Sequence, residues 1–175
     1  SHFKRHLNLG QWVTDAGRLD DAQRELDAAL ELARGYGERS LELARVEFAL
    51  ARLAYRRGAV ESARALASAA GERASAVPAS NIAFDVVMGT AHLRAVAGDL
   101  AGARTLLDSA LATYTRSGVG RPARIGEIFA RIAIVADSAG NAEDTETHAR
   151  AAVDRFHRGG VFVHPYLALA EAKLG

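Results

Sequence analysis

The chain has 175 residues, of which 49% are hydrophobic and 25% are charged, and its formal net charge is +1. This length and composition predict one folded domain and exclude a disordered chain. The absence of cysteine excludes disulfides and thiolate zinc sites, and no apolar run is long enough for a transmembrane helix. The small net charge gives no overall attraction to nucleic acid or to an anionic membrane.

Nine helices are expected in chain order, joined by short connections that contain glycine or proline. The expected ranges are 3–16, 19–35, 40–57, 60–75, 80–97, 100–116, 122–139, 142–157 and 164–174. Alanine occurs 38 times and proline only three times, which favours helix along the whole chain. Loops between successive helix pairs are expected at 35–37, 77–80, 118–122 and 159–160.

Four helix pairs carry the same motif at a nearly constant spacing. Gly17, Gly58, Gly98 and Gly140 are separated by 41, 40 and 42 residues, and a weaker copy ends at Gly175. Glycine can end the first helix of a pair because it enters the left-handed conformation at little cost. Small residues stand seven positions before and alanines twelve positions after each of the four, so the two helices can approach closely. Because one pair cannot bury its apolar face alone, successive pairs are expected to stack.

This pattern resembles the tetratricopeptide repeat (TPR), and the resemblance covers nearly the whole chain. The small residue, the glycine and the two alanines stand in register at Gly10, Gly17, Ala22 and Ala29 in the first copy. A period of about 41 residues is similar to the longer repeats of kinesin light chain, of peptide-pheromone receptors of bacilli and of sensor domains in bacterial transcription activators. The resemblance implies an all-α fold, a right-handed superhelix of stacked antiparallel helix pairs. The implied repeats are 3–39, 40–79, 80–120 and 121–160, with a partial copy at 161–175.

In this family the first helices of the pairs line a concave groove that holds the ligand. Positions 13, 10, 6 and 3 residues before each glycine share one helical face, which predicts the groove surface. The second repeat places arginine beside aromatic side chains there, a surface suited to a carboxylate, a phosphate or an acidic peptide. The predicted ligand-binding residues are Arg45, Phe48, Arg52, Tyr55, Arg56, Met88 and His92.

A second interpretation of this face is that it binds nothing. In that interpretation the arginines pair with Asp85, Glu47 or Glu127 and only make this face polar and solvated. Arg64, on a second helix, is expected to lie outside the groove and to serve as a neutral control. Trp12 and Tyr36 are expected to pack in the core or against loops.

The sequence predicts no enzymatic activity and no cofactor. It lacks a glycine-rich dinucleotide loop, a phosphate-binding loop and the Gly-x-Ser-x-Gly nucleophile motif. His2 with His6, and Asp144 with His148, are spaced four apart but lack a third ligand, so no metal site is predicted. Basic residues are interspersed with acidic ones, so this segment is not expected to contact nucleic acid directly or to bind a membrane.

These features predict a noncatalytic, cytoplasmic TPR binding module, a single domain over 1–175, that recognises a protein, a peptide or a small anionic effector. The resemblance implies the regulatory or sensor segment of a bacterial transcription or signalling protein. The alternative is a structural scaffold or a self-association module that forms a homo-oligomer. The last helix lacks a partner helix, so the chain is expected to be a fragment of a larger protein. The apolar side chains expected to be exposed there, and to carry self-association, are Phe162, Leu167, Leu169 and Leu174.

Overall fold

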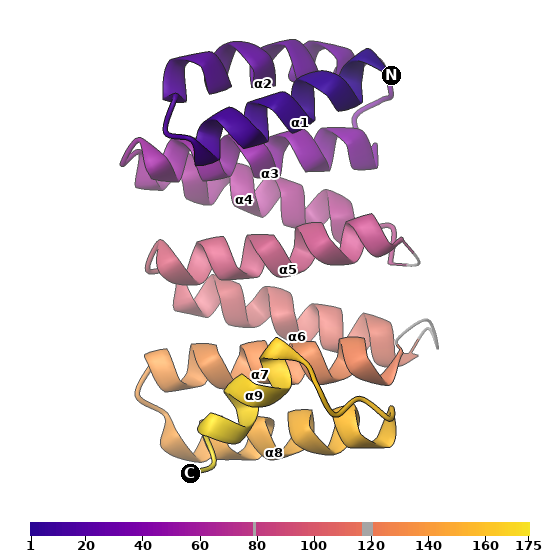
Figure 1. Cartoon of the computed structure of the whole chain (residues 1–175), viewed down its shortest axis with the longest axis vertical. Helices are drawn as coiled ribbons and strands as arrows, with labels where there is room; N and C mark the ends of the chain where they lie inside the picture. Colours follow the sequence, from indigo (N-terminus) through magenta and orange to yellow (C-terminus); the bar gives the residue numbers. More distant parts are fainter. Residues whose placement is uncertain (79, 117–120) are drawn as a thin grey trace. The chain divides into compact units, whose positions relative to one another are not determined.

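The computed structural model describes residues 1–78, 80–116 and 121–175, and every regular element in these ranges is an α-helix (Figure 1). The described helices are α1 (His2–Asp15), α2 (Leu19–Arg34), α3 (Leu41–Arg56), α4 (Val60–Ser75), α5 (Asn81–Val96), α6 (Leu100–Arg116), α7 (Pro122–Ser138), α8 (Ala142–Arg158) and α9 (Pro165–Ala172). The predicted all-α class is confirmed, and the expected boundaries differ from these by at most about two residues. Parts of two predicted loops, residue 79 and residues 118–120, lie outside the described residues.

The chain falls into two compact units, Ser1–Asp99 and Leu100–Gly175. In the first unit, α1 packs against α2 and α3 against α4 as antiparallel pairs, and α2·α3 and α4·α5 contacts join them in succession (Figure 1). In the second unit, α7 packs against α8, α6 packs against α7, and α9 contacts both α7 and α8. The predicted stacking of adjacent helices is therefore present within each unit. No helix in the described ranges is long and apolar enough to cross a membrane.

The four repeat glycines end the first helices in the way that the sequence predicts. Gly17, Gly58, Gly98 and Gly140 have φ angles of 78°, 77°, 82° and 76°, in the left-handed region that favours glycine. In each case the next residue donates its backbone N–H to a carbonyl of the last helical turn, at 2.8–3.0 Å. These bonds satisfy carbonyl groups that the end of a helix would otherwise leave without partners.

Small residues hold the paired helices close together. Ala51, Ala91 and Ala133, seven positions before a repeat glycine, are buried. At the same position in the first repeat stands Gly10, where an added Cβ would lie 2.6 Å from Leu26 Cδ2. The core is correspondingly spread along each unit. In the first unit, one cluster of buried residues spans α1 to α3 and another spans α3 to α5, and in the second unit a cluster joins α7, α8 and α9.

Two side chains, Leu167 and Trp12, lie elsewhere than the sequence predicts. Leu167 is only 2% exposed, because α9 docks on α7 and α8 and buries it there. The prediction of an exposed Leu167 was therefore wrong, whereas Phe162, Leu169 and Leu174 are exposed. Trp12 does not pack in the core but is 63% exposed. Tyr36, in the loop after α2, is also exposed, but its ring packs edge-on against the buried Phe3, in line with the expected loop packing.

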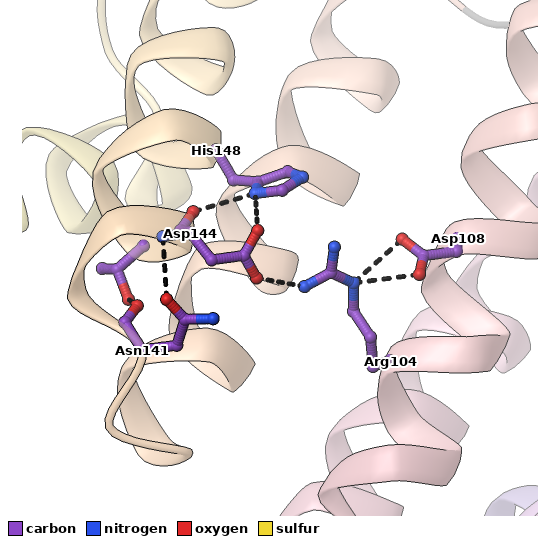
Figure 2. A network of polar contacts seen from close by, with 6 residues as sticks. Arg104, Asp108, Asn141, Asp144 and His148 are labelled. Atoms are coloured by element: carbon purple, nitrogen blue, oxygen red, sulfur yellow. Dashed lines mark hydrogen bonds and ion pairs between the residues drawn. The ribbon is translucent and has the colours of Figure 1, made fainter.

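A polar network joins α6 to α8 within the second unit (Figure 2). Arg104 donates to Asp108 at 3.0 Å and also to Asp144, which lies near the start of α8. His148 Nδ1 lies 3.0 Å from Asp144 Oδ1, so these two residues, spaced four apart, pair along α8. Asn141 caps α8 by accepting a hydrogen bond from the backbone N–H of Asp144 at 3.1 Å.

This network predicts a loss of stability in acid. The hydrogen bond from Arg104 lowers the pKa of the Asp144 carboxyl, and the charge of His148 lowers it further. A carboxyl whose pKa is lower in the folded chain stabilises the fold above its unfolded pKa of about 4, and this contribution is lost as the pH falls through the folded pKa. We expect Asp144→Asn to lower the free energy of unfolding at about pH 7 and to change it less at about pH 3, measured by urea denaturation.

Asp154→Asn is the control, because Asp154 forms an exposed pair with Arg158 on the same helix, and its replacement should change the free energy of unfolding little at either pH. An equal loss at both pH values for Asp144→Asn would contradict this account.

Candidate binding cavity in the first unit

A cavity of about 210 Å³ opens on the first helices of three successive pairs, α1, α3 and α5. We call it the Arg52 cavity. Its lining residues are Asp15, Phe48, Arg52, Tyr55, Arg56, Gly89, His92, Leu93 and Val96. Five of the seven residues predicted to bind a ligand are thus brought together in one place: Phe48, Arg52, Tyr55, Arg56 and His92.

Both arginines of the Arg52 cavity contact the C-terminal end of α1. Arg52 Nη2 lies 2.6 Å from Asp15 Oδ1, and Arg56 donates to the backbone carbonyl of Asp15 at 3.3 Å. The partner of Arg52 is therefore Asp15 and none of the three acids considered from the sequence. The side chains of Arg52 and Asp15 are 37% and 59% exposed, and an ion pair this exposed contributes at most about 1 kcal/mol of stability. A second carboxylate could therefore replace that of Asp15 at small cost.

The other walls of the Arg52 cavity are aromatic and aliphatic. The Phe48 ring packs directly on Gly89, where an added Cβ would lie 2.4 Å from Phe48 Cζ. The Tyr55 hydroxyl donates to the carbonyl of Val96 at 3.4 Å, which joins α3 to α5. His92 lines the same cavity from α5 and is exposed. The cavity thus offers two planar cations beside ring faces, an arrangement that suits a carboxylate attached to an apolar group.

Two predicted residues do not line the Arg52 cavity. Met88 is 2% exposed and belongs to the core, so its thioether is not presented to a ligand. The guanidinium of Arg45 lies 5.7 Å from the centre of the Phe3 ring, and Arg45 is not among the residues that line the cavity. Met88 stands ten residues before a repeat glycine, and its equivalents Leu7 and Ala130 are also buried. Only Phe48, at the same position in the second repeat, is half-buried and reaches the cavity, so this position faces the core in the other three repeats.

The expectation that Arg64 would be neutral also needs correction. Its Nε and Nη2 atoms donate to the backbone carbonyl of Ala97 at 3.1 and 2.6 Å. Arg64 therefore satisfies a carbonyl at the C-terminal end of α5, and its removal would disturb the helix that carries His92. It is a structural residue and cannot serve as a control.

Sequence reasoning missed four residues of the Arg52 cavity: Asp15, Gly89, Leu93 and Val96. A signal was present for two of them. Asp15, Arg56 and Val96 each stand two positions before a repeat glycine, and all three reach the cavity. Gly89 and Leu93 carry no such signal, because their part depends on how closely α3 and α5 approach.

Within the described ranges, no group of three histidine, cysteine or acidic side chains could hold a metal ion. No protein-family model and no curated protein matches the chain. Among solved structures, the crystal structure of BtubC (BKLC) from P. vanneervenii is similar over 98% of this chain and 78% of its own, with a TM-score of 0.60 and 13% sequence identity. At that identity the likeness shows the fold alone, and the fold that it shows is the helical arrangement described above.

Proposed function

We propose that the chain is a noncatalytic, TPR-like binding module whose ligand presents a carboxylate, either in an acidic peptide of a protein partner or in a small anionic effector. The observation that carries the proposal is the placement of Arg52 and Arg56 beside aromatic side chains in one cavity, with an exposed acid as the partner of Arg52. In this proposal the ligand carboxylate takes the place of Asp15 on Arg52. The rings of Phe48 and Tyr55 contact the apolar part of the ligand.

A regulatory role would follow from where the Arg52 cavity lies. Its walls come from α1, α3 and α5, which belong to three successive repeats. A ligand that contacts all three would favour one spacing of these helices over others, and a protein that senses its ligand through a change in shape needs such a preference. Together with the resemblance to bacterial sensor arrays, this supports our proposal that the chain is the sensor segment of a bacterial transcription or signalling protein.

The proposal predicts opposite effects of two substitutions that break the same ion pair. The probes are an array of short acidic peptides and the small acids succinate and citrate, with affinity measured by calorimetry for each probe that binds. Arg52→Ala should weaken binding about 10- to 100-fold, since it removes a hydrogen bond to a charged group. Arg52→Lys should not restore a bidentate contact. Asp15→Asn should strengthen binding, because it removes the competing carboxylate.

The control is Arg24→Ala, since Arg24 is an exposed arginine of α2 whose ion pair is with Asp21 on the same helix. Equal affinities for Arg52→Ala and the unchanged chain, or a larger loss for Arg24→Ala, would place the site elsewhere. Binding of the peptides but not of the small acids would identify a protein partner, and the reverse would identify a small effector. Binding by none of the probes would contradict the proposal.

A scaffold or self-association module is the second candidate, and the exposed Trp12 favours it. Trp12 stands five positions before a repeat glycine, where the three later repeats have Leu53, Leu93 and Val135, all buried. In this second proposal, an apolar surface of another copy covers Trp12. Light scattering should then show a mass that rises with concentration, and Trp12→Arg should hold the chain as a monomer. A monomeric chain at high concentration, or association unchanged by Trp12→Arg, would exclude this route.

A further inference from the structure

A second and larger cavity, of about 590 Å³, lies in the first unit between α2, α3 and α4. We call it the Glu47 cavity. Its lining residues are Leu30, Arg34, Glu38, Leu43, Glu47, Leu50, Leu66 and Arg73. It shares no lining residue with the Arg52 cavity, and two of its three helices are second helices of their pairs. It is therefore a separate site, on which the function proposed above does not depend.

Glu47 is the unusual residue of this cavity. Its side chain is only 12% exposed, among leucines, and burial raises the pKa of its carboxyl. Arg73 Nε donates to Glu47 Oε2 at 2.9 Å. This hydrogen bond uses Glu47 Oε2 and Arg73 Nε. Glu47 Oε1 can therefore still accept a hydrogen bond from a ligand, and the terminal nitrogens of Arg73 can still donate to one.

The second unit contains a cavity of about 490 Å³ at the corresponding place in the repeat, lined by Asp108, Leu111, Ala112, Thr115, Arg116, Phe129 and Arg155. Leu30 and Leu111 both stand 13 positions after a repeat glycine, and Arg73 and Arg155 both stand 15 after one. Eleven positions before the glycine, however, Glu47 of the first unit corresponds to Phe129 of the second.

This correspondence shows that the fold does not need a carboxylate at the place of Glu47. An aromatic side chain serves there in the second unit, beside an arginine at the equivalent position. Desolvating a carboxylate costs free energy that its ion pair recovers only in part. The acid at position 47 therefore calls for a role other than packing, and ligand binding is the role that a cavity offers.

The charges around the Glu47 cavity identify the chemistry of the ligand. Two arginines, Arg34 and Arg73, and two acids, Glu38 and Glu47, surround an apolar floor of four leucines. A purely anionic ligand would be repelled by the acids and a purely cationic one by the arginines. We propose that this cavity binds a small apolar zwitterion, with the ligand ammonium on Glu47 and the ligand carboxylate on Arg73.

Three related probes test the proposal: leucyl-leucine, its N-acetyl derivative without the ammonium, and its amide without the carboxylate. Binding is measured by calorimetry on the full chain carrying Arg52→Ala, so that carboxylate binding in the Arg52 cavity does not contribute. Leucyl-leucine should bind at one site per chain, and each blocked derivative should bind at least about tenfold more weakly, because each loses a charge-assisted hydrogen bond. Absence of saturable leucyl-leucine binding, or equal affinity for all three probes, would overturn the proposal.

Substitutions then locate the site. Glu47→Gln should weaken leucyl-leucine about tenfold but leave the N-acetyl derivative unchanged, because that derivative has no ammonium for Glu47 to bind. Glu47→Phe copies the second unit and should abolish binding while the helical circular dichroism is kept; if this variant does not fold, Glu47→Gln with the three probes decides alone. Arg24→Ala should have no effect. Leucyl-leucine affinity unchanged by Glu47→Gln would show that the zwitterion binds elsewhere and would overturn the assignment.

Discussion

Phe156→Ala should lower the free energy of unfolding by about 3–5 kcal/mol, the range for truncating a fully buried aromatic side chain. Phe156 is completely buried in the second unit. The Phe156 ring lies against Gly126 of α7, where an added Cβ would be 3.0 Å from the ring. The centre of the Phe156 ring is 4.8 Å from the centre of the His164 ring. His164 in turn accepts a hydrogen bond from the backbone N–H of Tyr166 in the first turn of α9. One side chain thus joins α7, α8 and the start of α9, so its loss leaves a cavity that no single helix can close.

Phe162→Ala is the matched control for this experiment. Phe162 lies six residues further along the chain but is 70% exposed, with its ring stacked on His157. Its truncation should change the free energy of unfolding by no more than about 0.5 kcal/mol. Chemical denaturation followed by circular dichroism measures both variants. Similar losses in the free energy of unfolding for the two variants would show that Phe156 does not contribute more than an exposed ring to the stability of the second unit.

The second large effect concerns two glycines that lie inside helices and differ in what surrounds them. Alanine at either position should gain up to about 1 kcal/mol of helix propensity. At Gly10 the new methyl would meet Leu26, which is completely buried, and overpacking of this kind costs about 1–3 kcal/mol. At Gly89 it would meet the tip of the Phe48 ring, which is half-buried and borders the Arg52 cavity. We therefore expect Gly10→Ala to be destabilising, and Gly89→Ala to change stability little because the ring moves into the cavity.

Urea denaturation distinguishes the two glycine variants. Gly89→Ala should keep the midpoint of the unchanged chain but weaken binding of any carboxylate probe, because the displaced Phe48 ring occupies the Arg52 cavity. Gly10→Ala should show the reverse, a lower midpoint with binding retained in the folded chain. If Gly89→Ala instead unfolds more easily than Gly10→Ala, the Phe48 ring is held more firmly than its exposure implies.

The repeat explains why so much of the fold could be predicted. A glycine that recurs every 40 to 42 residues indicates a helix end, because glycine enters the left-handed conformation at little cost. A small residue that recurs with it indicates a close contact between helices, so both features can be located without knowledge of the structure. The position of Leu167 was predicted wrongly because its burial depends on the docking of α9, which no local pattern determines.

The candidate site was harder to predict than the helices. Helical spacing brings Arg52 and Tyr55 to the same face, but it cannot tell whether a residue at the edge of that face points to the core, as Met88 does. Helical spacing also could not predict the ion-pair partner of Arg52, because Arg52 and Asp15 are 37 residues apart and meet only when α1 and α3 pack. The Glu47 cavity was missed because an acid inside an amphipathic helix has the same spacing whether it lies on the surface or among leucines.

The hydrogen bonds at the C-terminal end of α5 have a consequence for the energetics of ligand entry. The carbonyls of Val96 and Ala97 accept hydrogen bonds from Tyr55 of α3 and Arg64 of α4, so this end is tied to both helices. Within the same end, Arg94 pairs with Asp99 at 2.7 Å. The α1 wall of the Arg52 cavity is instead tied to Arg52 through an exposed carboxylate. One wall is therefore preorganised and the other exchangeable. Under the proposed function, a ligand would displace Asp15 without having to immobilise α5, so most of the conformational entropy lost on binding would come from the ligand itself.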